Sequence, residues 1–145
     1  MPKSKSFLPD VNVWLALVSK RHVHNRSALL WFESAGDDQT AFCRITQMGL
    51  LRLLTNQQVM GVDVFTLAGA WKIYNELIRD SRVRFLTEPA GIEDLWRQFT
   101  QETRPATNVW TDAYLQAFAQ LKNVYVVSFD RGFRRFEDPE AVILG

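Results

Sequence analysis

The chain alternates short apolar runs with longer stretches in which apolar residues recur every three or four positions. Short runs of this kind predict strands, and the longer period predicts amphipathic helices. The predicted strands cover residues 6–9, 40–45, 83–86, 124–129 and 141–144. The predicted helices cover residues 11–18, 25–35, 48–54, 67–78, 92–99 and 109–122, with Thr66 and Asn108 as expected N-caps of two of them.

The segment 124–129, with the sequence VYVVSF, is the clearest strand, because a continuous run of apolar and β-branched residues is typical of a buried strand. Strands separated by helical segments indicate βαβ units and a mostly parallel sheet. We therefore predict an α/β fold, a three-layer α/β/α sandwich with helices on both faces of the sheet and right-handed crossovers.

Size and composition fit one folded domain. At 145 residues, the chain is expected to form a single domain over residues 1–145. A content of 47% hydrophobic and 23% charged residues excludes intrinsic disorder. A formal net charge of +1 excludes a strongly basic, purely electrostatic nucleic-acid binder, while local basic clusters stay possible.

The cysteine count and the absence of targeting signals indicate a cytoplasmic protein. Cys43 is the only cysteine, so an intrachain disulfide and a Cys-rich zinc site are excluded. The basic start runs into Pro9 and Asp10, which argues against a signal peptide. Nowhere do eighteen apolar residues follow one another, so we expect no membrane span.

Three aspartates are the candidates for chemistry. Asp10 and Asp130 each follow a predicted strand, and Asp112 lies near the start of the helix that leads into the strand before Asp130. Because ligands bind at the carboxyl ends of parallel strands, we expect the three side chains to converge at one edge of the sheet. Taken singly, Asp10 and Asp130 are equally well explained as turn or cap residues, and only their convergence favours a site.

Carboxylates that converge repel one another unless a cation is shared among them. Hard oxygen ligands without cysteine select Mg²⁺ or Mn²⁺ over zinc. Such an ion activates water and stabilises charge on a phosphoryl oxygen. The residues alone therefore predict a metal-dependent phosphoryl or phosphodiester hydrolase. A phosphatase is a less favoured alternative. Asp10-Val11-Asn12 lacks the second carboxylate of an Asp-x-Asp nucleophile motif, and no Gly-rich phosphate loop is present in the sequence.

Four segments, in order along nearly the whole chain, are similar to a known family. They are residues 8–15 (LPDVNVWL), 43–55 (CRITQMGLLRLLT), 110–115 (WTDAYL) and 127–133 (VSFDRGF). These segments resemble the PIN domain and, more narrowly, the VapC-type toxins of bacterial type II toxin–antitoxin systems. The resemblance implies a Mg²⁺- or Mn²⁺-dependent ribonuclease. From the acids we expect water bound to the ion to attack the scissile phosphate, which leaves a 5′-phosphate and a 3′-hydroxyl. The resemblance also implies a cognate antitoxin and a homodimer.

Carried over residue by residue, the resemblance places the acids of the family on Asp10, Asp112 and Asp130, as catalytic and metal-binding residues. The polar residue typical of the position two before the last acid is Ser128, and Asn12 is a candidate to orient Asp10 or a metal-bound water. Asn12 is equally well explained as a residue that helps to begin its helix.

One position departs from the family pattern. Many members carry a Glu in the helix after the second strand, where this chain has Gly49, and the neighbouring Thr46 and Gln47 are neutral. The number of bound ions is therefore open. This gap also supports an alternative function, a catalytically inactive PIN-like module that binds RNA or protein. Some relatives with a similar Thr-Gln-x-Gly-Leu-Leu-Arg block share the gap, so it is not proof of inactivity.

Basic residues flank the predicted edge and are candidate ligands of RNA phosphates. They are Arg44, Arg131, Arg134 and Arg135. Pairing with nearby acids, or simple solvation, explains them equally well.

Two further groups favour structural roles. His22 and His24 lack a third ligand nearby and suit a helix start better than a metal site. Trp14 and Trp110 flank Asp10 and Asp112 and are able to stack on RNA bases, but we favour core packing for both.

Overall fold

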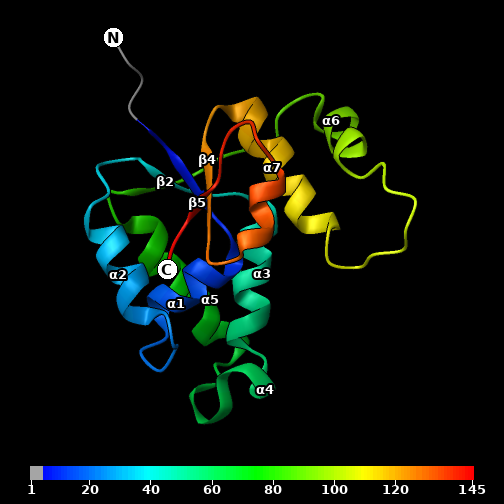
Figure 1. Cartoon of the computed structure of the whole chain (residues 1–145). Coiled ribbons are helices and arrows are strands. Elements are labelled where there is room, and N and C mark those ends of the chain that lie inside the picture. The colour runs from blue at the N-terminus through cyan, green and yellow to red at the C-terminus, as the bar shows by residue number, and fades with distance from the viewer. Residues whose placement is uncertain (1–4) are drawn as a thin grey trace.

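The computed structural model describes residues 5–145 and shows a five-stranded sheet in which every strand pair is parallel, in the order β3-β2-β1-β4-β5 (Figure 1). The strands are β1 (Phe7–Pro9), β2 (Thr40–Phe42), β3 (Val83–Phe85), β4 (Tyr125–Ser128) and β5 (Val142–Ile143). The prediction of a parallel α/β sheet is confirmed.

Helices fill the connections between the strands. The α-helices are α1 (Val11–Val18), α2 (Asn25–Glu33), α3 (Arg44–Leu54), α4 (Gln57–Met60), α5 (Leu67–Arg79), α6 (Ile92–Phe99) and α7 (Trp110–Lys122), and two 3₁₀ helices are η1 (Gly61–Asp63) and η2 (Arg131–Arg135). None of the helices within residues 5–145 combines the length and the apolar character needed to cross a bilayer.

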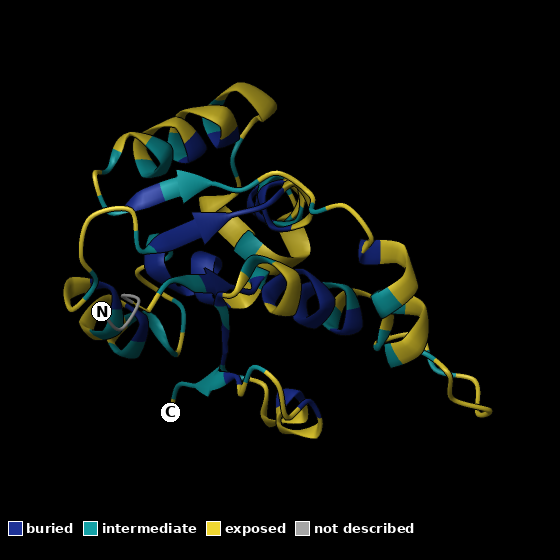
Figure 2. Ribbon diagram, turned by 90° about the horizontal axis from the view of Figure 1, so that it is seen from above, coloured by how far each residue is buried: buried dark blue, intermediate teal, exposed yellow. Residues whose placement is uncertain are grey.

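The sheet separates two hydrophobic clusters, which makes the molecule three-layered as predicted. One cluster joins Leu8 and Val126 of the sheet to α6 and α7, through side chains such as Phe118. The other joins Phe42 of the sheet to α1, α2, α3 and α5, through side chains such as Trp14. Figure 2 shows the central strands buried between helices whose outer faces are exposed. Burial of apolar side chains on both faces explains why the strands are continuous apolar runs.

The order of the strands reverses at β1, which lies between β2 and β4. Phe7 pairs with Thr40 on one side, and Leu8 pairs with Val126 on the other. The chain thus leaves β1 towards one edge of the sheet and later returns to its opposite side. The carboxyl ends of β1 and β4 flank this switch point, where ligands bind in open α/β sheets.

Three of the differences from the prediction concern the start of a helix. The strand expected over 40–45 ends at Phe42, because Cys43 is the N-cap of α3 and Arg44 and Ile45 are helical. The short helix α4 replaces part of an expected loop, with the Asn56 side chain accepting hydrogen bonds at its start. Asn108 is not the cap of α7: the N-cap position is Val109, and no side chain caps that helix.

Candidate active site

Asp10 lies where β1 passes into α1. Its backbone N–H donates to the carbonyl oxygen of Val127 at 2.9 Å, which ties the end of β1 to β4. Its carboxylate accepts a hydrogen bond from the backbone N–H of Val13 at 3.1 Å, so Asp10 is the N-cap of α1. The Ser128 hydroxyl donates to the other carboxylate oxygen at 2.5 Å. Asp10 is therefore buried and held from both sides.

The environment of Asp10 opposes its charge. Burial raises the pKa of the Asp10 carboxyl, and the negative charge of Asp130 raises it further. Hydrogen bonds from Ser128 and from the backbone amides of Val13 and Asn12 lower the pKa and offset part of this effect. Asn12 thus contacts Asp10 through its backbone, while its side chain is exposed.

Ser128 links Asp10 to Asp130. The Ser128 hydroxyl oxygen accepts a hydrogen bond from the backbone N–H of Asp130 at 2.9 Å while its proton is donated to Asp10. The exposed Asp130 side chain accepts from the backbone N–H of Gly132 at 2.8 Å, which fixes it at the start of η2. A Cβ atom at position 132 would lie 3.0 Å from the Asp130 carboxylate, so glycine leaves this oxygen room.

Asp112 lies in the first turn of α7, half-buried, and approaches the same group of charges. Burial raises the pKa of Asp112 to about 6, and the charges of Asp130 and Asp10 contribute to the increase. The Arg135 guanidinium, 3.6 Å from the Asp112 carboxylate, acts in the opposite direction. The three sequence-predicted acids therefore lie close enough to influence one another's ionisation.

The fit of this group to a divalent cation depends on its donor chemistry. Within residues 5–145, no three His, Cys, Asp or Glu side chains are grouped tightly enough to hold an ion as they stand. The donors are nonetheless carboxylate oxygens, the type that Mg²⁺ and Mn²⁺ prefer. Burial and mutual repulsion raise the pKa of Asp10 and Asp112, and a shared cation would relieve both effects. The residues therefore fit a hard divalent cation.

The structure gives a physical reason for Gly49. A Cβ atom at this position would lie 2.5 Å from a methyl group of Val11, so α3 packs directly against the start of α1. The neighbouring polar residues serve α3 itself: Thr46 forms the capping box with Cys43, and the Gln47 side chain accepts a hydrogen bond from Arg44. No acid of α3 therefore joins the group around Asp10, since α3 contains none.

The candidate RNA-binding arginines are divided between two places. Arg131 and Arg134 are exposed on η2, beside Asp130, and form no ion pair with the described residues. Arg44 is the first residue of α3, and its guanidinium covers the Phe85 ring at 4.9 Å. Arg135 is the member of the basic stretch that contacts an acid of the site, a pairing that sequence spacing alone did not specify.

The structure also tests the structural roles predicted for the tryptophans and histidines. Trp14 is fully buried and stacks on Phe42 with ring centroids 3.8 Å apart, as expected of a core residue. The expectation of core packing for Trp110 is wrong, because this residue is 53% exposed. His24 stacks on Phe129 with ring centroids 4.2 Å apart and donates its backbone N–H to the His22 ring, which agrees with structural roles.

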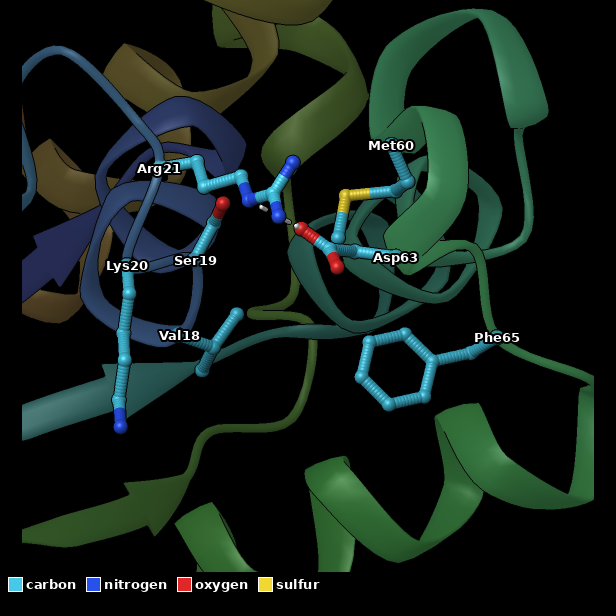
Figure 3. A pocket seen from close by; sticks show the side chains of 7 residues that line it. All are labelled: Val18, Ser19, Lys20, Arg21, Met60, Asp63 and Phe65. Atoms are coloured by element: carbon cyan, nitrogen blue, oxygen red, sulfur yellow. Dashed lines mark ion pairs between the residues drawn. The ribbon is translucent and has the colours of Figure 1, made fainter.

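A separate hollow lies at the opposite end of α1 (Figure 3). It has a volume of about 340 Å³ and is lined by Val18, Ser19, Lys20, Arg21, Met60, Asp63 and Phe65. An ion pair between Arg21 and Asp63, 3.3 Å long, bridges it. Since α1 has eight residues, this hollow is about 12 Å along the helix from Asp10 and includes none of the three acids.

The sequence profile of the PIN domain matches residues 7–139. Ribonuclease VapC41 from Mycobacterium tuberculosis is 39% identical over 142 residues, which cover 94% of this chain and 97% of the relative. Ribonuclease VapC38 from the same organism is 29% identical over 125 residues, which cover 86% of this chain and 85% of the relative.

Solved structures agree with the fold. Mycobacterium tuberculosis VapC20, a toxin that cleaves the sarcin-ricin loop, superposes with a TM-score of 0.68 at 13% identity, over 97% of this chain and all of that one. A toxin–antitoxin complex from Klebsiella pneumoniae gives a TM-score of 0.66 at 20% identity, over 94% and 96% of the two chains.

Proposed function

From the premise that this chain belongs to the PIN-domain family, as a ribonuclease toxin of the VapC type, we propose that it hydrolyses RNA at the edge formed by Asp10, Asp112 and Asp130. We propose further that the hydrolysis depends on Mg²⁺ or Mn²⁺ held by these acids. The observation that carries this proposal is the grouping of the acids: Ser128 links Asp10 to Asp130 by hydrogen bonds, and burial, together with the charges of Asp130 and Asp10, raises the pKa of Asp112 to about 6.

The three acids and the groups that contact Asp10 would have different roles in the reaction. Asp10 and Asp112 would bind the ion directly or through water, and Asp130 would complete or orient its surroundings. When bound, the ion supplies a Lewis acid for the phosphate oxygens and lowers the pKa of a water molecule. Ser128 and the Val13 amide hold the Asp10 carboxylate in one orientation, which saves the cost of ordering it during the reaction.

Arg135 is placed to act on the substrate. Its guanidinium is already beside Asp112, and a planar guanidinium is suited to bind two phosphate oxygens at once. When RNA enters, Arg135 would exchange its carboxylate partner for the scissile phosphate. Water then adds to the phosphorus while the bond to the 3′ oxygen breaks, which leaves a 3′-hydroxyl on one fragment and a 5′-phosphate on the other.

The test compares Asp112→Asn with Asp37→Asn, a matched substitution of an exposed acid outside the site. We expect Asp112→Asn to abolish RNA cleavage in Mg²⁺ or Mn²⁺ with the fold intact, and Asp37→Asn to leave cleavage unchanged. Sequencing of new RNA 5′ ends after induced expression of both variants identifies the cut sites. Cleavage by well-folded Asp112→Asn protein at the wild-type rate would refute the assignment.

The alternative of an inactive binding module rests on Gly49, since α3 supplies no acid to the site. Titration with Mn²⁺ separates the two functions, because a catalytic site predicts saturable binding that is lost in Asp10→Asn. An inactive module predicts no such binding and no cleavage.

We also propose two protein partners. Toxin–antitoxin complexes are among the solved structures with this fold, which supports an antitoxin that covers the acidic edge. Exposed apolar side chains on α3 and α5, including Met48, Leu67 and Trp71, are candidates for a homodimer contact. Light scattering of the purified chain alone and with its antitoxin tests both.

A further inference from the structure

We propose that Trp110 and the loop before α7 form a binding site for one unpaired RNA base next to the scissile phosphate. This inference rests on the proposed ribonuclease function and specifies its substrate as RNA with an accessible, unpaired base near the cut. Three features carry it: the exposure of Trp110, the rigid support beneath it, and a cavity that it lines.

Trp110 presents a large aromatic surface to solvent, with 53% of the residue exposed. An indole left at the surface gives up much of the free energy that burial would provide, so its position calls for a reason. Its surroundings hold it in place. The indole N–H of Trp96 donates to the carbonyl oxygen of Trp110 at 2.9 Å, and the two rings meet edge to face at 6.1 Å.

Trp96, which contacts Trp110, is itself held by a further aromatic residue. Trp96 also meets the Tyr114 ring edge to face, with centroids 5.6 Å apart. The Tyr114 hydroxyl donates to the Glu88 carboxylate at 2.6 Å. Trp110 is therefore backed by α6 and by the next turn of α7. A platform that is rigid before binding loses little conformational entropy when a base stacks on it.

A cavity of about 290 Å³ lies beside Trp110, and its other walls come from the loop between α6 and α7. Pro105, Ala106 and Val109 provide apolar surface, while Thr100 and Thr107 provide hydroxyl groups. Arg104 and Glu102 also line the cavity, and they form an ion pair with 2.9 Å between their charged atoms. Aromatic and apolar walls for the face of a base, with a few polar groups at its edge, are how proteins bind bases of single-stranded RNA. Figure 1 shows α6 and this loop projecting beside α7.

The cavity is close to the proposed chemistry. Trp110 and Asp112 are two residues apart on α7, so they are separated by about 3 Å along the helix axis and lie on opposite sides of a cylinder about 10 Å wide. A strand that crosses the start of α7 would therefore place a phosphate at Asp112 and a neighbouring base at Trp110. Continuity with the acids favours RNA over a protein segment as the occupant.

The test measures RNA binding in the Asp112→Asn background, in which the RNA is not expected to be cut. The probes are a short unpaired oligoribonucleotide and the same sequence held in a duplex. We expect Trp110→Ala to raise the Kd for the unpaired RNA about five- to a hundred-fold, the range for loss of one base–aromatic stack. Trp110→Phe should retain most of the affinity. Leu121→Ala, which removes another exposed apolar side chain from the far end of α7, should leave the Kd unchanged.

Two results would overturn the inference. One is the same Kd for the Trp110→Ala protein as for the Leu121→Ala control. The other is an unchanged Kd together with an altered oligomeric state of Trp110→Ala in light scattering, which would make the cavity a contact between copies of the chain. Failure of the proposed function is recognised separately, since it appears as RNA cleavage by the Asp112→Asn protein, whatever the Kd values are.

Discussion

The β1–α1 and β2–α3 junctions lie side by side in the sheet and are built alike, but only the first has a charged side chain at its helix cap. In each, a three-residue strand ends and one extended residue becomes the N-cap of the following helix, Asp10 in the first and Cys43 in the second. The Asp10 carboxylate accepts the N–H of Val13 at 3.1 Å. At the other junction, the Thr46 hydroxyl accepts the N–H of Cys43 at 3.0 Å.

The difference comes from what lies opposite each cap. Asp10 is buried close to Asp130, and burial together with the charge of Asp130 raises the pKa of its carboxyl. Cys43 is buried in the apolar cluster beneath α7, and burial raises the pKa of its thiol, which stays neutral. The same strand-to-helix geometry therefore serves stability at one junction and, in the proposed function, chemistry at the other. The neighbouring elements, β4 and α7, decide which.

The largest expected effect is on the rate of cleavage. Asp10→Asn removes a charge that the proposed ion requires, so the cleavage rate should fall about a thousand-fold or more, which corresponds to about 4 kcal/mol of lost transition-state stabilisation. Cys43→Ala, at the equivalent cap, should leave the rate unchanged. Initial rates on one RNA at fixed Mn²⁺, with circular dichroism to confirm folding, make the comparison. Equal losses in both variants would mean that the junctions act only through stability.

The second largest expected effect is on the free energy of unfolding in the absence of divalent ions. Because Asp112 has a folded-state pKa of about 6 against an ordinary 3.8, the folded protein holds this proton more tightly than the unfolded chain does. Its contribution therefore favours the fold at acid pH and is lost as the pH rises from about 4 to about 6. Over this pH range, the contribution of Asp112 to the free energy of unfolding changes by about 2 to 3 kcal/mol.

Asp112→Asn removes the free-energy cost of holding a charged carboxylate at this position above about pH 6. In the absence of divalent ions at pH 7, the variant should exceed the wild type in free energy of unfolding by about 2 kcal/mol, and the difference should shrink towards pH 4.5. Urea unfolding at several pH values measures it. Mg²⁺ should stabilise the wild type and not the variant. A variant that is less stable than the wild type at pH 7 would show Asp112 to be a structural residue.

Substitution of Gly49 tests how closely α3 packs against the start of α1. Alanine is normally about 1 kcal/mol better than glycine inside a helix. Here the added Cβ would meet Val11 at 2.5 Å, so Gly49→Ala should instead lower the free energy of unfolding by about 2 kcal/mol. In a Val11→Ala background, the same substitution should become neutral or stabilising. Thermal unfolding of the four proteins gives the coupling, and an absence of any sign change would contradict the close packing of α3 on α1.

The elements and the grouping of the acids were predictable because they follow from local pattern and parallel topology. Asp10 and Asp130 each end a strand beside the switch point, and apolar runs mark those strands in the sequence. The exposure of Trp110 was not predictable, because its neighbour Trp96 comes from another helix. The pairing of Arg135 with Asp112 was likewise hidden among several basic residues, since only tertiary structure selects one of them.

The smallest effect is expected at the β2–α3 junction, whose cap residue is uncharged. The buried Thr46 hydroxyl accepts the N–H of Cys43 and donates to its carbonyl oxygen at 3.1 Å. Thr46→Val keeps the shape and removes both bonds, so the free energy of unfolding should fall by about 1 kcal/mol, the usual contribution of a helix cap. The cleavage rate per folded molecule should not change, because the site of Asp10 is built on the other junction. Denaturant unfolding and initial rates on the same preparation give both quantities. A fall in rate without a fall in stability would mean that the second junction also orders the acids, and the contrast between the two would then be one of degree.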